Sequence, residues 1–372
     1  MGFARRALPA HGLLAHSWWR RSARRHLCGG DDGWIFGHLL DGAGGSKALA
    51  PWDDGAVRRA REGQGSWVHL DLRAPKAEDF IASCARVRGR DDEICRRTHV
   101  SSLMVADPRK TQPRCEVSSA CSGVMLTLRA NFGKRFEAHA VESKNVVPFR
   151  LWLGRGILVT ARGAAPDEGS LRMPALSRRL DAGAGPRSCG ALASAVISEI
   201  TSITADSVEA LEDEIFELKA RLQREALLAG AHRPVGPAAL EAIRRELMPL
   251  RYAAITMRRH EVPELAALQT VVRLSGRPQQ QLFADADGYE LREAEARQEA
   301  LVESLHATIA AGEALQNEVG AHAAWQQSTY SAQLTTLGCV LSVLGLCSVS
   351  FDALAFLQGE GAFAAAVRSL FA

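Results

Sequence analysis

Several sequence patterns that mark enzymes and metal-binding domains are missing from this chain of 372 residues. Its eight cysteines occur singly, and its histidines lack zinc-finger spacing, which excludes a structural zinc site of that kind. Neither a Gly-x-x-x-x-Gly-Lys-Ser/Thr loop nor a Gly-x-Gly-x-x-Gly turn opening a helix is present. No Ser, His and Asp set has the context of a nucleophile elbow. We therefore expect reduced thiols, no enzymatic activity and no resident cofactor.

Charge is unevenly distributed along the chain, although the net charge is only +3. No basic patch on a folded domain is evident, so we expect no nucleic-acid partner. Residues 1–30 hold six Arg and no acidic residue, which predicts either a basic tail or a mitochondrial or plastid transit peptide. Residues 288–331 hold seven Glu and two Arg. That pattern predicts either the solvated face of a helix or a surface that attracts cations.

The longest stretch without Lys, Arg, Asp or Glu runs from Val319 to Phe351 and contains 33 residues. Its inner part, Leu334 to Phe351, is mostly apolar and is just long enough to cross the hydrocarbon core of a bilayer as a helix. We expect a transmembrane helix at residues 332–352. The segment 353–372 is too short and too polar for a clear second span, which predicts a short C-terminal tail or a degenerate second span.

Residues 31–187 have the pattern of an α/β soluble domain with a mixed sheet. Alternating or apolar runs predict strands, a glycine-rich turn follows the first of them, and Gly154-Arg-Gly156 predicts a hairpin. A helix is expected from Pro75 to Arg88. The expected strands are Trp34–Leu40, Trp67–Leu72, Val124–Arg129, Val146–Leu153 and Ile157–Ala161.

Residues 188–331 have the apolar spacing of long helices, and we expect a helical stalk there. The first helix should end near Gly230. We expect a second helix from Ala238 to His260 and a shorter third from Pro263 to Leu274. A last helix from Tyr289 to Phe351 would be roughly 90 Å long at 1.5 Å per residue. A helix of this length suits a soluble head joined to a membrane.

This layout resembles the CorA-type divalent-cation transporters, and most closely their ZntB-like zinc-transporter branch. The motifs that carry the resemblance lie in order between about residues 33 and 333: Leu39-Leu-Asp-Gly-Ala-Gly-Gly-Ser-Lys47, Ser66-Trp-Val-His-Leu-Asp71, Thr111-Gln-Pro-Arg114, Leu126-Thr-Leu-Arg129, Phe149-Arg-Leu-Trp-Leu-Gly-Arg-Gly-Ile-Leu-Val-Thr-Ala-Arg162, Leu211-Glu-Asp-Glu214 and Thr329-Tyr330.

The resemblance implies a fold, partners and a location. It implies an α/β cytoplasmic domain, a long helical stalk and a C-terminal transmembrane helix that lines a pore. It also implies a homo-oligomer, a pentamer in this family, that contacts membrane lipid and transports Zn²⁺ or Mg²⁺. The soluble head would lie on the cytoplasmic or matrix side, and Thr329 and Tyr330 would mark the membrane entrance.

The chain departs from the family at the selectivity filter, for which the family uses a Gly-x-Asn loop. Counting from Tyr330, the filter position is Ser350, Phe351 and Asp352. Five copies of Asp352 would form a carboxylate ring able to bind a hydrated divalent cation. The alternative is that Asp352 only ends the helix at the membrane surface. The family's basic residues before Thr329 are also replaced, by Gln326-Gln-Ser328.

Two features of the apolar helix, its hydroxyl groups and its small residues, each allow two interpretations. Its hydroxyls could face a water-filled pore or bond back to their own helix, and Gly338, Ser342 and Gly345 could serve close helix packing or be filler. The function has an alternative as well. Instead of transporting a divalent cation, the chain could be a non-conducting, single-span regulatory or scaffold relative, or an incomplete gene model of a transporter.

Overall fold

The computed structural model describes residues 33–53, 55, 64–72, 74–84, 112–118, 123–131, 146–154, 156–162, 173–230, 233–276, 282–357 and 369. These residues belong to two compact units. The first unit comprises Met1–Ile215 and Met248–Ala311, and the second comprises Phe216–Leu247 and Gly312–Ala372. Three long helices contribute residues to both units, so each unit is described by itself.

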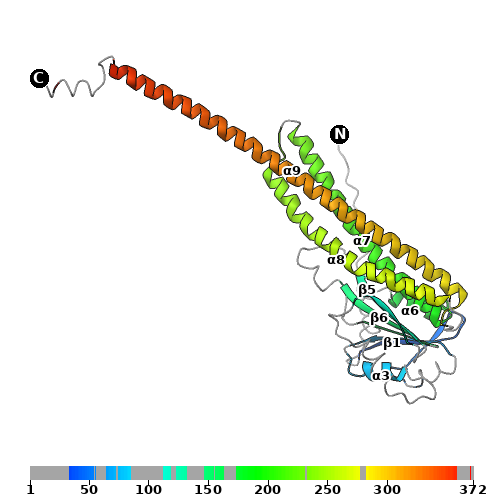
Figure 1. Ribbon diagram of the computed structural model, residues 1–372. Helices are drawn as coiled ribbons and strands as arrows, with labels where there is room; N and C mark the ends of the chain where they lie inside the picture. Colours follow the sequence, from blue (N-terminus) through cyan, green and yellow to red (C-terminus); the bar gives the residue numbers. More distant parts are fainter. Residues whose placement is uncertain are drawn as a thin grey trace, which may run out of the picture. The chain divides into compact units, whose positions relative to one another are not determined.

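A seven-stranded mixed sheet forms the base of the first unit (Figure 1). Its strand order is β2-β1-β3-β7-β6-β5-β4, and only the β3–β7 pair is parallel. This confirms the expected mixed sheet. The strands are β1 (Trp34–Leu40), β2 (Ser46–Ala48), β3 (Ser66–Asp71), β4 (Arg114–Ser118), β5 (Gly123–Asn131), β6 (Val146–Gly154) and β7 (Ile157–Arg162).

The predicted strands and the hairpin are confirmed, and β2 and β4 are additional. β6 and β7 pair antiparallel around Gly156, whose φ of 73° lies in the left-handed region that favours glycine. β2 escaped prediction because it has only three residues, none of them buried. A strand of that kind carries no alternation of apolar and polar residues.

Both faces of the sheet are buried, because successive side chains of a strand point to opposite sides. In β6, Phe149, Leu151 and Leu153 pack on one face, while Trp152 packs on the other. The second face is covered by α3 (Ala77–Cys84), through Phe80 and Ile81. Helices cover the first face, so α3 and the long helices lie on opposite sides of the sheet (Figure 1).

Four helices pack on the first face, and their apolar residues join those of the strands in one core. They are α6 (Met173–Asp181), α7 (Cys189–Ala229), α8 (Pro237–Ser275) and α9 (Asp285–Leu357). The predicted end of α7 near Gly230 is confirmed, since Gly230 has a φ of 79° and follows the last helical residue. The nine-residue α6 was not expected.

α8 corrects the prediction of two helices between Ala238 and Leu274. The helix is continuous from Pro237 to Ser275 and contains Pro249 and Pro263. A proline inside a helix removes one backbone hydrogen bond, but packing can offset that loss. Buried residues continue on both sides of Pro263, and two of them, Glu261 and Glu264, are charged by type. The sequence had suggested that a new helix begins at Pro263, since proline favours the first turn of a helix.

The second unit is built from the end of α7, the start of α8 and the later part of α9. Leu222 of α7, Ile243 of α8 and Leu315 of α9 are among its buried residues. Arg221 and Glu246 form an ion pair at 3.0 Å between α7 and α8. Such an exposed pair contributes little, so apolar burial carries most of the stability of this unit.

Two predicted segments lie wholly or largely outside the described residues. The basic tail or transit peptide at residues 1–30 is one of them. The other is most of the predicted C-terminal segment 353–372, of which the structure describes residues 353–357 and Ser369. The division into 1–30, 31–187, 188–331, 332–352 and 353–372 therefore stays a prediction. Four cysteines, Cys115, Cys189, Cys339 and Cys347, are free thiols.

Candidate membrane segment and filter position

The apolar part of α9 is exposed on all of its described faces. Every described side chain from Leu334 to Ser350 is solvent-exposed in the single chain, including Leu334 at 72% and Val340 at 52%. Water-soluble proteins rarely expose contiguous apolar surface of this extent. Among the described residues, α9 is the one helix long and apolar enough to cross a membrane. This segment is therefore built to be covered by lipid or by other protein surfaces.

The hydroxyl groups of this segment bond to their own helix. Thr335 Oγ1, Thr336 Oγ1 and Ser342 Oγ donate to the carbonyl oxygens four residues earlier at 2.8–2.9 Å. Ser350 Oγ donates to Leu346 O at 2.7 Å in the same way. Of the two readings of these hydroxyls, the structure therefore shows the intrahelical one. Such bonds satisfy the polar group without any partner outside the helix.

The filter position lies inside α9. Ser350, Phe351 and Asp352 are all helical, and the helix continues to Leu357. The alternative that Asp352 ends the helix is therefore wrong. A Gly-x-Asn filter is a loop, whereas this backbone makes no turn at residues 350–352. The assignment of these three residues as a filter, and of Asp352 as a metal ligand, stays a prediction.

The predicted membrane entrance also lies in the middle of α9. Thr329 Oγ1 donates to Trp325 O at 2.9 Å, and the side chain of Tyr330 is 55% exposed. Trp325 is exposed too, with the His322 ring near it at a centroid distance of 6.4 Å. Trp and Tyr side chains gather where membrane helices meet water. Trp325 was missed in the sequence analysis, although an aromatic residue just before an apolar run can indicate a membrane–water interface.

Gln326 has a packing role that the sequence did not reveal. It replaces a basic residue of the family pattern, and its side chain is buried. Its Nε2 donates to Val235 O at 2.9 Å, which ties α9 to the segment that precedes α8 within the second unit. A buried amide that is satisfied in this way fixes the contact between the two segments.

Most glutamates of α9 before the apolar segment lie on its solvated face. Glu290, Glu293, Glu299, Glu303 and Glu313 are exposed. Nowhere in the described ranges do three His, Cys, Asp or Glu side chains gather into a group that could hold a metal ion. The structure thus shows the solvated face that the sequence predicted, and attraction of cations by these residues remains a proposal.

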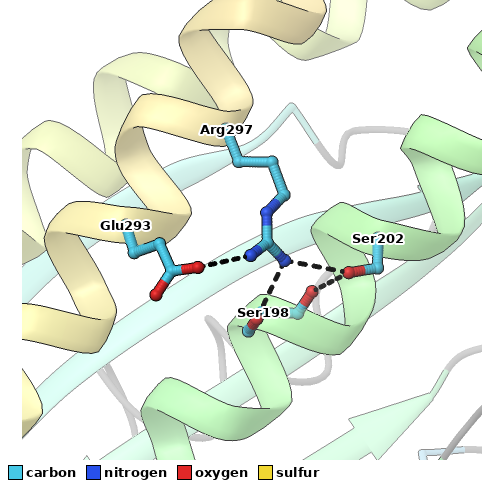
Figure 2. Close-up of polar contacts among 4 residues, drawn as sticks. All are labelled: Ser198, Ser202, Glu293 and Arg297. Carbon is cyan, nitrogen blue, oxygen red and sulfur yellow. Dashed lines mark hydrogen bonds and ion pairs between the residues drawn. The ribbon is translucent and has the colours of Figure 1, made fainter.

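Arg297 is the last Lys or Arg before the apolar segment, and it is bound to α7 (Figure 2). Its Nη1 donates to Ser198 Oγ at 3.4 Å and to Ser202 Oγ at 3.2 Å. Its Nη2 forms an ion pair with Glu293 Oε1 at 2.8 Å. The basic group thus joins α9 to α7 in the first unit. Because no Lys or Arg lies between Arg297 and the apolar segment, the positive-inside rule gives little information on the orientation of the segment.

Two described histidines of the long helices act as a surface residue and a packing residue. His306 is exposed, and His232 lies outside the described residues. His260 accepts a hydrogen bond at Nε2 from Arg129 Nη1, at 2.8 Å. Burial, followed by the charges of Arg129 and Arg259, lowers the pKa of His260 to about 4, so its ring is neutral at pH 7.

Solved structures share the fold of this chain. The full-length CmaX protein is 18% identical, with a TM-score of 0.60 over 89% of this chain and 87% of that protein. The CorA magnesium transporter from Methanocaldococcus jannaschii is 13% identical, with a TM-score of 0.60 over 86% and 87%. The ZntB cytoplasmic domain from Vibrio parahaemolyticus is 12% identical, with a TM-score of 0.55 over 77% and 97%.

Sequence comparisons identify the family. No curated protein matches this chain in sequence. The family described as "CorA-like Mg2+ transporter protein" matches residues 92–344, which is more than half of the chain. That match contains most of the sheet, the long helices and the start of the apolar segment. Together with the mixed sheet, the long helices and the apolar C-terminal helix, it shows that this chain belongs to the CorA-like Mg²⁺ transporter family.

Proposed function

We propose that this chain transports a divalent metal cation, Zn²⁺ or Mg²⁺, across a membrane. The observation that carries the proposal is the apolar segment Leu334–Val349, whose described side chains are all exposed, on the helix whose first part packs against the sheet. In a member of a transporter family, such a segment fits a helix that crosses the bilayer. The family consists of transporters and not enzymes, which agrees with the absence of enzyme motifs.

The proposal includes a homo-oligomer, with five copies of α9 around one pore. One apolar helix cannot enclose a channel by itself, so several copies are needed. Gly338 and Gly345 would let neighbouring helices approach closely, since a Cβ added at either position would meet nothing within 4 Å in the single chain. The soluble head would lie on the cytoplasmic or matrix side.

Asp352 is the proposed cation-binding residue. Five carboxylates around a pore axis form a cation-selective ring, and divalent cations accept such oxygen ligands while retaining water. The solvated glutamates of α9 would raise the local cation concentration on the side of the head. Likeness to a ZntB cytoplasmic domain supports the ZntB-like branch, and with it Zn²⁺, but only at the level of the fold.

A second candidate function is a non-conducting regulatory or scaffold protein with a single span. It is favoured by the helical backbone at residues 350–352, where the family has a filter loop. Serine and aspartate stand there in place of the family's glycine and asparagine. In that case the stalk would assemble copies of the chain without opening a pore.

Uptake of Zn²⁺ and Mg²⁺ into liposomes that contain the purified full-length chain tests the proposal. We expect saturable uptake by the wild type. Asp352→Ala should reduce uptake by about tenfold or more, which corresponds to about 1.4 kcal/mol of lost stabilisation of the ion. The matched control is Asp213→Ala, which removes an exposed carboxylate of α7 and should leave uptake unchanged.

Different outcomes would contradict the proposed transport and the proposed role of Asp352. A wild-type chain that inserts and assembles but takes up neither cation would establish the non-conducting alternative. Uptake that is the same in Asp352→Ala and the wild type would overturn only the assignment of Asp352 as a cation-binding residue.

A further inference from the structure

Two glutamates of α8 are buried against the sheet domain. Glu261 is 1% exposed and Glu264 is 0% exposed. They are three residues apart, which places their side chains on the same face of the helix. An ionised carboxylate is costly to bury unless opposite charges and hydrogen bonds compensate it. Their position therefore requires an explanation beyond packing.

Each glutamate connects α8 to a different element of the first unit. Glu264 Oε2 accepts a hydrogen bond from the backbone N–H of Arg129, in β5, at 2.9 Å. Glu261 Oε2 accepts one from Gln298 Nε2, in α9, at 2.7 Å. The contacts of α8 with the sheet and with α9 thus both include a buried carboxyl group.

The described residues around the pair do not supply enough positive charge for two carboxylates. Arg129 is the cation that attracts both of them, and it is half-buried. Its guanidinium also donates to the neutral ring of His260. Arg259 of α8 is exposed and repels Arg129, and the contact that α9 makes with Glu261 comes from the neutral amide of Gln298. One guanidinium facing two ionised carboxylates would leave a buried excess negative charge.

Burial and mutual repulsion act on both groups in the same direction. Burial raises the pKa of Glu261. Burial and then the charge of Glu261 raise the pKa of Glu264 well above its ordinary range. Two carboxyl groups that interact in this way titrate as a pair, and the first proton released leaves the second more tightly held.

The hydrogen bonds of the cluster can accommodate a proton. Among the described residues, Glu264 Oε1 and Gln298 Oε1 have no hydrogen-bond partner. A protonated carboxyl group becomes a donor, and an amide can either donate or accept after a half-turn of its plane. Gln298 can therefore bond to Glu261 in either protonation state.

We propose that Glu261 and Glu264 form a proton-binding site, which holds one shared proton in the folded chain and stabilises the packing of α8 against β5 and α9. Loss of that proton places two like charges beside one guanidinium, and the repulsion weakens both contacts. Packing of the long helices on the sheet then depends on pH. The inference does not rest on the proposed function, because its ligand is the proton and not the transported cation.

The direction of the pH dependence follows from linkage. In the unfolded chain both carboxyl groups release their protons near their ordinary pKa, whereas the folded chain keeps one. The folded chain therefore binds more protons, and the contribution of the pair to stability falls as pH rises above that ordinary range. The buried histidines act oppositely, since burial lowers their pKa. For this reason the test compares variants at each pH instead of following the wild type alone.

Thermal unfolding of the full-length chain in detergent, between about pH 5 and about pH 8, measures the linkage. Glu264→Gln keeps the shape of the side chain and needs no proton. The difference between the Tm of this variant and the Tm of the wild type should increase with pH, by about 2 °C per pH unit. Glu261→Gln should behave alike. The control Glu241→Gln replaces an exposed glutamate of the same helix, and its Tm difference should not change with pH.

Infrared difference spectra give a direct readout. The wild type should show the C=O stretching band of a buried protonated carboxyl group that disappears at high pH, and either Gln variant at the pair should alter or remove it. Tm differences that are independent of pH in both variants would overturn the proposal. A wild-type spectrum without a protonated carboxyl band would overturn it as well.

Discussion

Gly190, in the first turn of α7, has no room for a larger side chain. A Cβ built there would lie 2.5 Å from Asp287 Oδ2 and 2.6 Å from the carbonyl oxygen of Leu282. Both neighbours belong to the segment that begins α9, so α7 and α9 approach closely at this point. A backbone carbonyl cannot move aside as a flexible side chain can. The absence of a side chain at residue 190 thus determines how closely these two segments pack.

Gly190→Ala should destabilise the chain by about 1–3 kcal/mol, because the added methyl group overpacks the contact. Gly320→Ala is the matched control, since residue 320 is also helical and a Cβ there meets nothing within 4 Å. That control should stabilise by up to about 1 kcal/mol through helix propensity alone. Thermal unfolding of both full-length variants is the measurement. Equal effects of the two substitutions would contradict the close contact at Gly190.

Single residues were the hardest to interpret from the sequence. Glu261, Glu264 and Gln326 are polar by type, and residues of these types are mostly exposed. All three are buried, because partners far away in the chain accept or donate their hydrogen bonds. No local pattern contains the partners: Arg129 precedes Glu264 by 135 residues. By contrast, the solvated glutamates of α9 could be predicted, since a charged face needs no partner.

At the scale of elements, α9 joins two chemically different halves in one helix. Residues before Val319 alternate buried and exposed positions, as a helix packed on one side does. The described side chains from Leu334 to Ser350 are mostly apolar and are exposed on all sides of the helix. The glycines at 312, 320, 338 and 345 do not break it. Glycine weakens a helix by only about 1 kcal/mol, which flanking helical residues compensate.

Leu341→Arg should weaken membrane attachment, because a charge at the centre of a membrane helix costs about 2.5–3.5 kcal/mol. Leu341 is 60% exposed, so the substitution disturbs no packing within the single chain. Gln316→Arg places the same charge on an exposed, more polar part of α9 and serves as the control. The fraction of chain that stays in membranes after an alkaline wash is measured. Equal retention of both variants would contradict the location of Leu341 in the hydrocarbon core.

At the scale of the whole molecule, the sheet and helices of the first unit bury their apolar residues within one chain. The apolar segment of α9 does not bury its side chains in the single chain. Its side chains contact nothing in the single chain that would remove them from water. Lipid can cover the outer side of such a helix, and copies of the same helix can cover the rest. Membrane lipid and other copies of the chain can thus each cover part of this exposed apolar surface, and a transporter requires both.

The purified chain in detergent should have a protein mass of about 200 kDa if five copies of 40.1 kDa assemble. Light scattering that subtracts the detergent, or native mass spectrometry, gives this value. Gly338→Leu and Gly345→Leu together should lower it, because large side chains keep neighbouring helices apart. A monomeric wild type of about 40 kDa would contradict the oligomer.

Local patterns in the sequence were sufficient for the mixed α/β domain, the long helices and the apolar segment, because strand alternation, helical spacing and a charge-free run each depend on neighbouring residues. Only the tertiary structure showed that α8 is one helix, that α9 continues past Asp352 to Leu357, and that Glu261 and Glu264 are buried together. These features depend on packing and on charge balance between segments far apart in the chain. A helix can tolerate a proline, and a core can hold a carboxyl group, only when distant residues compensate the cost.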